Sequence, residues 1–492
     1  MSFKQNRGVF MAAVKKEPEL VPLKLLIDEK NHRVVAAEAN KDFVDILFSF
    51  LTLPMGTIMR LITSANEKTT ASVPVGCMNK LYEGVQNLSS EYWQTEHCKN
   101  MVLNPRNPLA KYCKNLKVNI DDSGPELTYG CNSVYQFVNN TGSIMFYRER
   151  LAAMERGRCK YYSIYRNVKC VCGKGITTKE MTAKAKAGDS SSEGVSFLKR
   201  GIEFLISDNL QVRPASPAVL AQLIPDIGSA DGTRIREMRV EASKVEVIYL
   251  LACALVSETP LSDVFLGKRP GYGIVGTQGK RPRLENNFSS SQAALPVKST
   301  VEQNGHTLKL KVTYAKSTKE ILFGEATNEF FDFLCTFLTI PIGSMMRVLE
   351  GKSGLTCMDN LYRSVLDLDH KWFQESAKNN LLNPCIAKYH NCKKQPLKSI
   401  GTESYADSYY LINPRESDNF AVEPSMFLVP DDLGVKSLSG ASSFLLLKDM
   451  GIPFSQTEVQ WVTLGTKEAL SLLKAALTSP SSALSNGLGP YL

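Results

Sequence analysis

No apolar run in the sequence is long enough to cross a bilayer as a helix. The longest apolar stretches lie at 43–62 and 245–257. The first is interrupted by Asp45, Pro54 and Arg60, and the second is too short to span the hydrocarbon core. We interpret both stretches as buried core helices.

A secretory signal is also lacking. The N-terminal segment MSFKQNRGVFMAAVKKEPEL has no apolar core, and the patterned sequence begins only near Val21, so that Met11 is an alternative start to Met1. The twelve cysteines are scattered along the chain, which is typical of a reducing compartment where thiols are free or metal-bound. We therefore expect an intracellular protein, cytoplasmic or nuclear and not secreted.

Charge of one sign does not dominate either. The 58 basic and 49 acidic residues leave a net charge of +9 in 492 residues, which is too mild to indicate a nucleic-acid binder by itself. The hydrophobic share of 43% and the charged share of 22% are ordinary globular values. They exclude a wholly disordered, collagenous or coiled-coil chain, and the length predicts about three domains.

The chain contains an internal duplication. FSFLTLPMGTIMRLI at 48–62 and CTFLTIPIGSMMRVL at 335–349 share seven of fifteen positions. Four further matches keep the same order along the chain. They join LKLLID (23–28) to LKLKVT (308–313), CMNKLYEGVQNL (77–88) to CMDNLYRSVLDL (357–368), FLISDNLQV (204–212) to FLVPDDLGV (427–435), and LLACALVS (250–257) to LLKAALTS (472–479). The sequence therefore predicts a two-module unit, A and B, that occurs twice around a linker.

We divide the chain accordingly into eight segments. They are a flexible N-terminus (1–19), module A (20–125), a cysteine-containing insert (126–194), module B (195–266), a Gly-rich and basic linker (267–305), the second module A (306–400), a connector (401–424) and the second module B (425–492). Each module combines short strands with helices, so the fold class is α+β. We expect A and B to pack together within each half.

Local patterns predict the elements of the first copy. LKLLID and RVVAAEA form a hairpin, and Asp42 caps a buried helix at 43–53. Pro54 either ends this helix or begins a second helical turn. An amphipathic helix is predicted at 78–93. Module B is predicted as a strand at 203–206, a helix at 217–225, a strand at 235–241 and a helix at 243–256.

These motifs resemble a known plant family. LKLLIDEKNHRVVAAEANKDFVDILFSFLTLP, CMNKLYEGVQNL, LNP, FLISDNLQV and LSDVFLG are together similar to the family called domain of unknown function 674, over about 20–266 and 306–488. The resemblance implies a land-plant, intracellular protein that is often built from repeated units, and it implies no activity or ligand. The long basic linker and the cysteine-free second connector depart from the family.

Four cysteines of the insert are the strongest candidates for a functional site, because they are possible metal ligands. They are Cys131, Cys159, Cys170 and Cys172, the last two in KCVCGKG. Four thiolates hold structural zinc in many proteins, although zinc sites favour C-x₂-C pairs and this pair is C-x-C. The equivalent region at 401–424 has no cysteine. Structural zinc and free thiols in a loop-rich insert both stay open.

Three pairs of equivalent residues are weaker candidates. Cys77 and Cys357 stand at a helix start, where a thiol can be activated, but no histidine recurs beside them, and a buried packing role is the simpler interpretation. Asp208 and Asp431 follow equivalent strands and are interpreted as setting a turn through their own backbone. Arg60 and Arg347 are interpreted as surface or ion-pair residues rather than as an anion site.

The linker carries a basic cluster at Lys280, Arg281 and Arg283. Such a cluster suits a solvated linker, a nuclear-import signal or a contact to nucleic acid. GYGIVG at 271–276 lacks the flanking strand and helix of a dinucleotide site. We expect 267–305 to be disordered, because it has too few large apolar residues to offset the entropy of ordering.

We expect a non-catalytic interaction or regulatory protein with an unknown protein partner. No paired carboxylates, triad or phosphate loop stand at matching positions in both copies. The alternatives are an enzyme of unrecognised type, which a deep pocket with convergent polar groups would favour, and a nuclear factor, which a basic face on the modules would favour.

Overall fold

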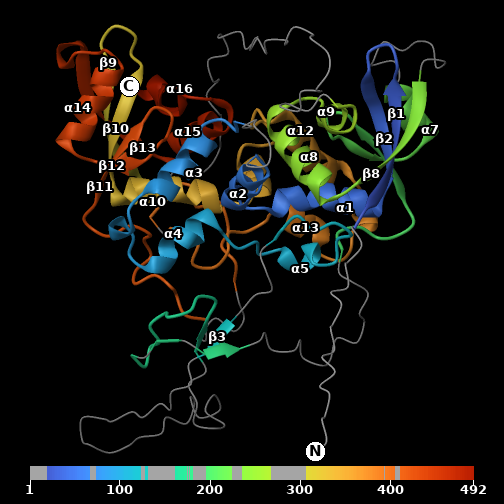
Figure 1. Ribbon diagram of the computed structural model, residues 1–492, viewed down its shortest axis with the longest axis horizontal. Helices are drawn as coiled ribbons and strands as arrows, with labels where there is room; N and C mark the ends of the chain where they lie inside the picture. Colours follow the sequence, from blue (N-terminus) through green and yellow to red (C-terminus); the bar gives the residue numbers. More distant parts are fainter. Residues whose placement is uncertain are drawn as a thin grey trace, which may run out of the picture.

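Two five-stranded antiparallel sheets lie at opposite ends of the molecule, with a layer of helices between them (Figure 1). The computed structural model describes residues 19–66, 74–122, 128–130, 161–173, 175–176, 178–180, 196–223, 235–267, 306–392, 394–404 and 411–492. The α+β class is confirmed. Within these ranges, no helix combines the length and the apolarity that crossing a membrane requires.

The first sheet has the strand order β7-β6-β2-β1-β8. Its strands are β1 (Val21–Asp28), β2 (Arg33–Asn40), β6 (Glu203–Ser207), β7 (Val212–Pro214) and β8 (Ile235–Ala242). Along β1, alternate residues from Val21 to Ile27 are buried, which is the period-two pattern of a strand with one face on the core. Modules A and B of the first half therefore share one sheet.

The second sheet repeats this order as β12-β11-β10-β9-β13. Its strands are β9 (Leu308–Ala315), β10 (Ile321–Thr327), β11 (Met426–Pro430), β12 (Lys436–Ser437) and β13 (Thr457–Leu464). A third, small sheet consists of β3 (Thr128–Gly130), β4 (Tyr162–Ser163) and β5 (Thr178–Glu180).

Cross-strand ion pairs fix which residues of the two sheets correspond. Lys24 lies opposite Glu38 and Lys311 opposite Glu325, with Nζ–carboxylate distances of 2.7 and 3.0 Å. Lys24 is therefore equivalent to Lys311, whereas the match of LKLLID with LKLKVT set it against Lys309. That part of the sequence match is wrong by two residues, because apolar residues that alternate with period two fit either register without changing faces.

Apart from α5, which has no counterpart among the described residues of the second half, the helices occur in the same order in both halves. They are α1 (Lys41–Ser49), α2 (Met55–Asn66), α3 (Met78–Asn87), α4 (Glu96–Leu103), α5 (Ala110–Cys113), α7 (Pro217–Leu223), α8 (Lys244–Val256) and α9 (Pro260–Phe265), followed by α10 (Asn328–Thr339), α11 (Ile342–Val348), α12 (Thr356–Asp367), α13 (Ala377–Leu382), α14 (Gly440–Asp449), α15 (Thr466–Thr478) and α16 (Ala483–Leu488). The cap of α1 is Asn40, whose side chain accepts from the Asp42 N–H, so the prediction that Asp42 caps this helix is wrong by two residues.

The two halves cross at the equivalent prolines Pro54 and Pro341. Met55 N–H donates to Ile340 O at 3.1 Å, and Ile342 N–H donates to Leu53 O at 3.0 Å. These reciprocal bonds form an antiparallel bridge centred on the two prolines. Each proline stands just before a helix, so the missing proline N–H costs no helical hydrogen bond.

The helices before this crossing, α1 and α10, contact their own sheets, whereas α3 and α12, which follow it, contact the other half. Cys77 N–H, at the start of α3, donates to Ala476 O of α15 at 2.9 Å. Conversely, Val212 N–H of β7 donates to Ser364 Oγ of α12 at 2.9 Å. Figure 1 shows α3 and α4 beside the second sheet and α12 beside α8 and α9 of the first half.

The loops that follow α3 and α12 repeat this exchange. Gln94 N–H donates to Phe420 O, and Gln374 N–H donates to Phe197 O, both at 2.9 Å. Modules A and B of one half share a sheet as expected, but the helices α3 and α12 of the two A modules pack on the other half. One continuous hydrophobic core joins both halves as a result.

Candidate functional site

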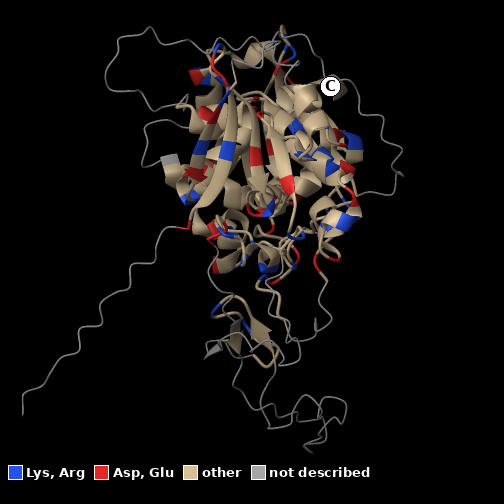
Figure 2. Cartoon of the chain, turned by 90° about the vertical axis from the view of Figure 1, so that its right-hand side faces the viewer, with Lys and Arg blue, Asp and Glu red and all other residues tan. Residues whose placement is uncertain are grey.

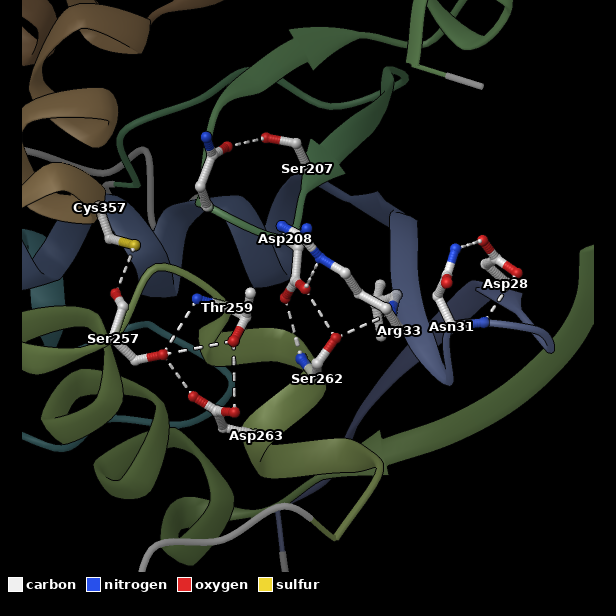
Figure 3. A network of polar contacts seen from close by, with 12 residues as sticks. Asp28, Asn31, Arg33, Ser207, Asp208, Ser257, Thr259, Ser262, Asp263 and Cys357 are labelled. Carbon is white, nitrogen blue, oxygen red and sulfur yellow. Dashed lines mark hydrogen bonds and ion pairs between the residues drawn. The ribbon is translucent and has the colours of Figure 1, made fainter. Parts of the chain in front are cut away.

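Asp208 lies at the end of β6 and is buried in a polar network (Figure 3). Its Oδ1 accepts from Ser262 N–H at 2.9 Å, and its Oδ2 accepts from Ser262 Oγ–H at 2.7 Å. Arg33 Nε–H donates to the same Oδ2 at 3.1 Å. Ser262 Oγ in turn accepts from Val34 N–H at 2.8 Å, so the carboxylate fastens the start of α9 to β2.

Asp431 makes the equivalent contacts in the second half. Its carboxylate accepts from Ser485 N–H and from Ser485 Oγ–H, both at 2.7 Å, and Ile321 N–H donates to Ser485 Oγ at 2.9 Å. Burial raises the pKa of Asp431 to about 6. Both aspartates are structural as expected, but they bond a serine of a distant helix and not their own turn.

A hollow of about 240 Å³ lies beside Asp208, and Arg33, Ser207, Asn209 and Gln211 are among its lining residues. Its polar groups bond one another, because Ser207 Oγ–H donates to Asn209 Oδ1 at 2.6 Å. Arg33 and Ser262 already occupy the carboxylate of Asp208. The hollow therefore presents no carboxylate poised for acid–base chemistry.

Cys77 and Cys357 are buried thiols that donate to backbone carbonyls. Cys77 Sγ–H donates to Ser479 O at 2.9 Å, and Cys357 Sγ–H donates to Ser257 O at 3.1 Å (Figure 3). Burial raises the pKa of Cys77 to about 12 and raises that of Cys357 as well. The packing role is confirmed, since a nucleophile requires the thiolate.

The equivalent arginines bind the last residues of their own module A. Arg60 forms a bidentate pair with Asp122 at 2.6 and 2.8 Å, which raises the pKa of the arginine and lowers that of the aspartate. Arg347 donates to Ser399 O at 2.7 Å. The structural interpretation of both arginines is confirmed.

The cysteine-containing insert is described only in part. Cys170 is buried and Cys172 is half-buried, in a turn closed by a 2.8 Å bond from Gly173 N–H to Cys170 O. Gly173 has a φ of +84°, which favours glycine. Cys131 and Cys159 lie outside the described residues, as do Lys280, Arg281, Arg283 and all but the first residue of the predicted disordered linker. Within the described ranges, no three His, Cys, Asp or Glu side chains group as metal ligands do.

Asp45 and Asp332 are equivalent buried acids in α1 and α10 with different surroundings. Asp45 Oδ1 accepts from Leu198 N–H at 2.9 Å, and Lys41 Nζ lies 3.1 Å from Oδ2. Asn328 stands in the place of Lys41 beside Asp332, and its amide instead bonds Glu423. Burial raises the pKa of Asp45 to about 6 and that of Asp332 to about 7.

The outer face of the second half carries large apolar side chains that are exposed to solvent. They lie on α14, on the short 3₁₀ helix η6 (Phe454–Gln456) and on β13. We call the following residues, with their exposed fractions, the apolar surface: Phe444 and Leu445 (both 53%), Met450 (42%), Phe454 (57%), Val459 (55%) and Trp461 (60%). The rings of Phe444 and Phe454 stack with centroids 6.3 Å apart, beside a hollow of about 310 Å³.

The first half has charged residues at the two places that correspond to Val459 and Trp461 of β13. Trp461 pairs with Lys311, and Arg239 pairs with the equivalent Lys24, so Trp461 corresponds to Arg239. Val459 corresponds to Glu237 by the same register. Glu237 and Arg239 approach each other to 3.6 Å. Figure 2 shows basic and acidic residues along the strands of the first sheet. The apolar surface is therefore a difference between the two halves.

Sequence reasoning missed this surface. TEVQWVTL places apolar residues on both faces of β13, at 459 and 461 as well as at 462 and 464. Only the second pair is buried. The signal that was available is the comparison with IREMRVEA of β8, which is apolar on one face and charged on the other.

Comparison with known proteins gives one match. A family model described as "Protein of unknown function (DUF674)" matches residues 17–467, in agreement with the resemblance of the sequence motifs. No curated protein and no solved structure matches the chain.

Proposed function

We propose that this chain, which belongs to the DUF674 family, is an intracellular, non-catalytic interaction protein that binds a protein partner through its apolar surface. The observation that carries the proposal is the exposure of six large apolar side chains on α14, η6 and β13. Large exposed apolar patches mark protein-binding sites more often than single exposed residues do, and the stacked rings of Phe444 and Phe454 join α14 to η6. Aromatic residues such as Phe454 and Trp461 are also enriched at the energetic centres of protein interfaces.

The proposal includes the origin of the two halves by tandem duplication. The identical strand order, the paired Lys24–Glu38 and Lys311–Glu325 contacts, and the Asp208–Ser262 and Asp431–Ser485 networks support it. One copy keeps charged residues on its edge strand β8. The other copy has Val459 and Trp461 at the corresponding places of β13, as an apolar binding surface requires.

Substitution of two residues on β13 tests whether the apolar surface binds a partner. Val459→Glu together with Trp461→Arg gives β13 the charges that β8 has at these positions, and we expect loss of the partner with the fold retained. Removing a buried tryptophan anchor costs about 2 kcal/mol or more in a typical interface, or roughly 30-fold in affinity. The measurement is quantitative capture from a cell extract of the source tissue with immobilised wild-type and variant protein.

The matched control changes the other half at the same positions, as Glu237→Gln with Arg239→Gln. The control should capture the same proteins as the wild type, and both variants should keep the wild-type melting temperature. Equal capture by the Val459→Glu/Trp461→Arg variant and the wild type would rule out the apolar surface as the binding site.

A structural zinc ion in the insert is a separate proposal. Gly130 of β3 pairs with Tyr162 of β4, and in sequence Cys131 directly follows the first while Cys159 shortly precedes the second. This pairing supports a site made of Cys131, Cys159, Cys170 and Cys172, all thiolates, which would leave no position open for a substrate.

The zinc proposal predicts about one zinc ion per purified chain by elemental analysis. Cys170→Ser with Cys172→Ser should abolish it and increase proteolysis between 126 and 194, while the unfolding of the rest is unchanged. Cys253→Ser is a suitable control, because this buried cysteine belongs to α8 in the helical core. Wild-type protein that is purified without chelators and contains no zinc would contradict the proposal.

A further inference from the structure

We propose that the occupant of the apolar surface is a second copy of this chain, which pairs its strand β13 antiparallel with β13 of the first copy. The inference rests on the proposed function, since it names the partner of the same surface. It would join the two outer sheets edge to edge into one continuous sheet.

The first argument is the position of β13. It closes one edge of its sheet, where eight successive residues pair with β9. Among the described residues, no strand pairs with its other edge. An edge strand offers unpaired N–H and C=O groups along its length, and a strand of eight residues is about 27 Å long.

The second argument is that β13 carries little protection against pairing. Natural edge strands are blocked by lysine, proline, bulges or other charges. TEVQWVTL contains a single charged residue, Glu458, and its carboxylate already accepts from Tyr314 O–H at 2.7 Å and from Lys319 Nζ–H at 3.3 Å. The corresponding edge strand β8 carries four charged residues: Arg236, Glu237, Arg239 and Glu241.

The third argument is that β13 complements itself. In an antiparallel pair, directly opposite residues share a face. A two-fold axis at Gln460 sets Val459 of each copy opposite Trp461 of the other, both on the exposed face. Aromatic and β-branched side chains form favourable cross-strand pairs. In this register Gln460 lies opposite Gln460 of the second copy, and no charged residues of like sign on the two β13 strands are opposed.

Sedimentation equilibrium tests the inference on the full-length protein. The chain has a mass of 54.5 kDa, and we expect the wild type to form dimers at micromolar concentration. Val459→Glu with Trp461→Glu should weaken dimerisation at least about 100-fold, because it removes two opposed apolar pairs and sets like charges opposite each other. Glu237→Gln with Arg239→Gln should dimerise as the wild type does. A wild type that stays monomeric at about 100 µM would overturn the inference, and so would a dimer that survives the first variant.

A cysteine at the proposed axis tests the register. Gln460→Cys should form an intermolecular disulfide under mild oxidation, since the Cβ atoms of directly opposite residues lie about 5 Å apart. Met238→Cys, at the corresponding place on β8, should not cross-link beyond the wild-type level. A dimer without the Gln460→Cys cross-link would overturn the pairing.

The two proposals fail in different ways. A monomeric wild type that still loses captured proteins in the Val459→Glu/Trp461→Arg variant would overturn the second copy as occupant and leave the binding surface in place. A monomeric wild type whose capture is unaffected by the variant would overturn both.

Discussion

Gly343→Ala is expected to lower the free energy of unfolding by about 2–4 kcal/mol. Gly343 follows Pro341 at the crossing of the two halves, where a Cβ would lie 2.7 Å from Leu51 O. Leu51 belongs to the other half, and its oxygen is a backbone atom that cannot rotate away. The equivalent Gly56 is as crowded, with Val102 O at 2.6 Å from a built Cβ, and Gly56→Ala should have a similar effect.

Helix propensity alone predicts that Gly343→Ala raises the free energy of unfolding, so the sign of the measured change distinguishes the two effects. Gly343 lies in the first turn of α11, where alanine is ordinarily better than glycine by up to about 1 kcal/mol. Gly440 is the first residue of α14, and nothing lies within 4 Å of a Cβ built there. Gly440→Ala should therefore be neutral or mildly stabilising in urea unfolding. Equal effects of Gly343→Ala and Gly440→Ala would show that the crossing is not tightly packed.

Asp332→Asn is expected to stabilise the protein at pH 8 by about 2–4 kcal/mol and to have little effect at pH 4. Asp332 Oδ1 accepts from Phe420 N–H and Ala421 N–H at 3.1 and 3.0 Å, which an amide oxygen can also do. Its Oδ2 is buried without a hydrogen-bond partner. Asparagine therefore keeps the useful contacts and removes a buried negative charge.

The direction follows from the raised pKa of Asp332. Burial raises it from 3.8 to about 7, against the opposing influence of the Phe420 and Ala421 amides and of Arg415, so the folded state binds the proton more tightly than the unfolded state does. The contribution of this group to stability is therefore greatest below pH 4 and is lost as the pH rises to 7. The variant should lack this decline, which urea titrations at pH 4, 6 and 8 would measure.

Asp45→Asn is the matched control for Asp332→Asn. Lys41 Nζ lies 3.1 Å from Asp45 Oδ2, so the substitution breaks this ion pair and leaves the lysine with Asp42, whose Oδ1 lies 3.4 Å away. Because the pKa of Asp45 is also raised, but only to about 6, we expect a smaller stabilisation at pH 8 than in Asp332→Asn. Stabilisation of equal size in both variants would mean that the Lys41–Asp45 pair does not distinguish the two sites.

The sequence predicted the elements of the first copy more closely than their assembly. The helix predicted at 243–256 is α8, and the strand predicted at 235–241 is β8, because both have strong local patterns. The exchange of helices could not be predicted in this way. Two similar halves offer similar docking sites, so the pattern of α3 is the same whether it packs on its own sheet or on the other one.

The exposure of the apolar surface could not be predicted from the sequence for a related reason. A strand with apolar residues on both faces is typical of a fully buried strand. Only the structure shows that Val462 and Leu464 face the core while Val459 and Trp461 face solvent. Because one face of β8 carries charged residues, the sequence alone indicates which face of that strand is buried. β13 has no such charged face.

Cleavage between the halves tests the exchange most directly. A specific protease site is inserted between Gln292 and Ala293, in the linker, and the purified protein is cut to completion. Because each half completes the other's core, the two fragments should remain together in size-exclusion chromatography and unfold in a single transition. Neither fragment expressed alone should fold cooperatively. Fragments that separate under native conditions, each with its own cooperative unfolding transition, would contradict the account.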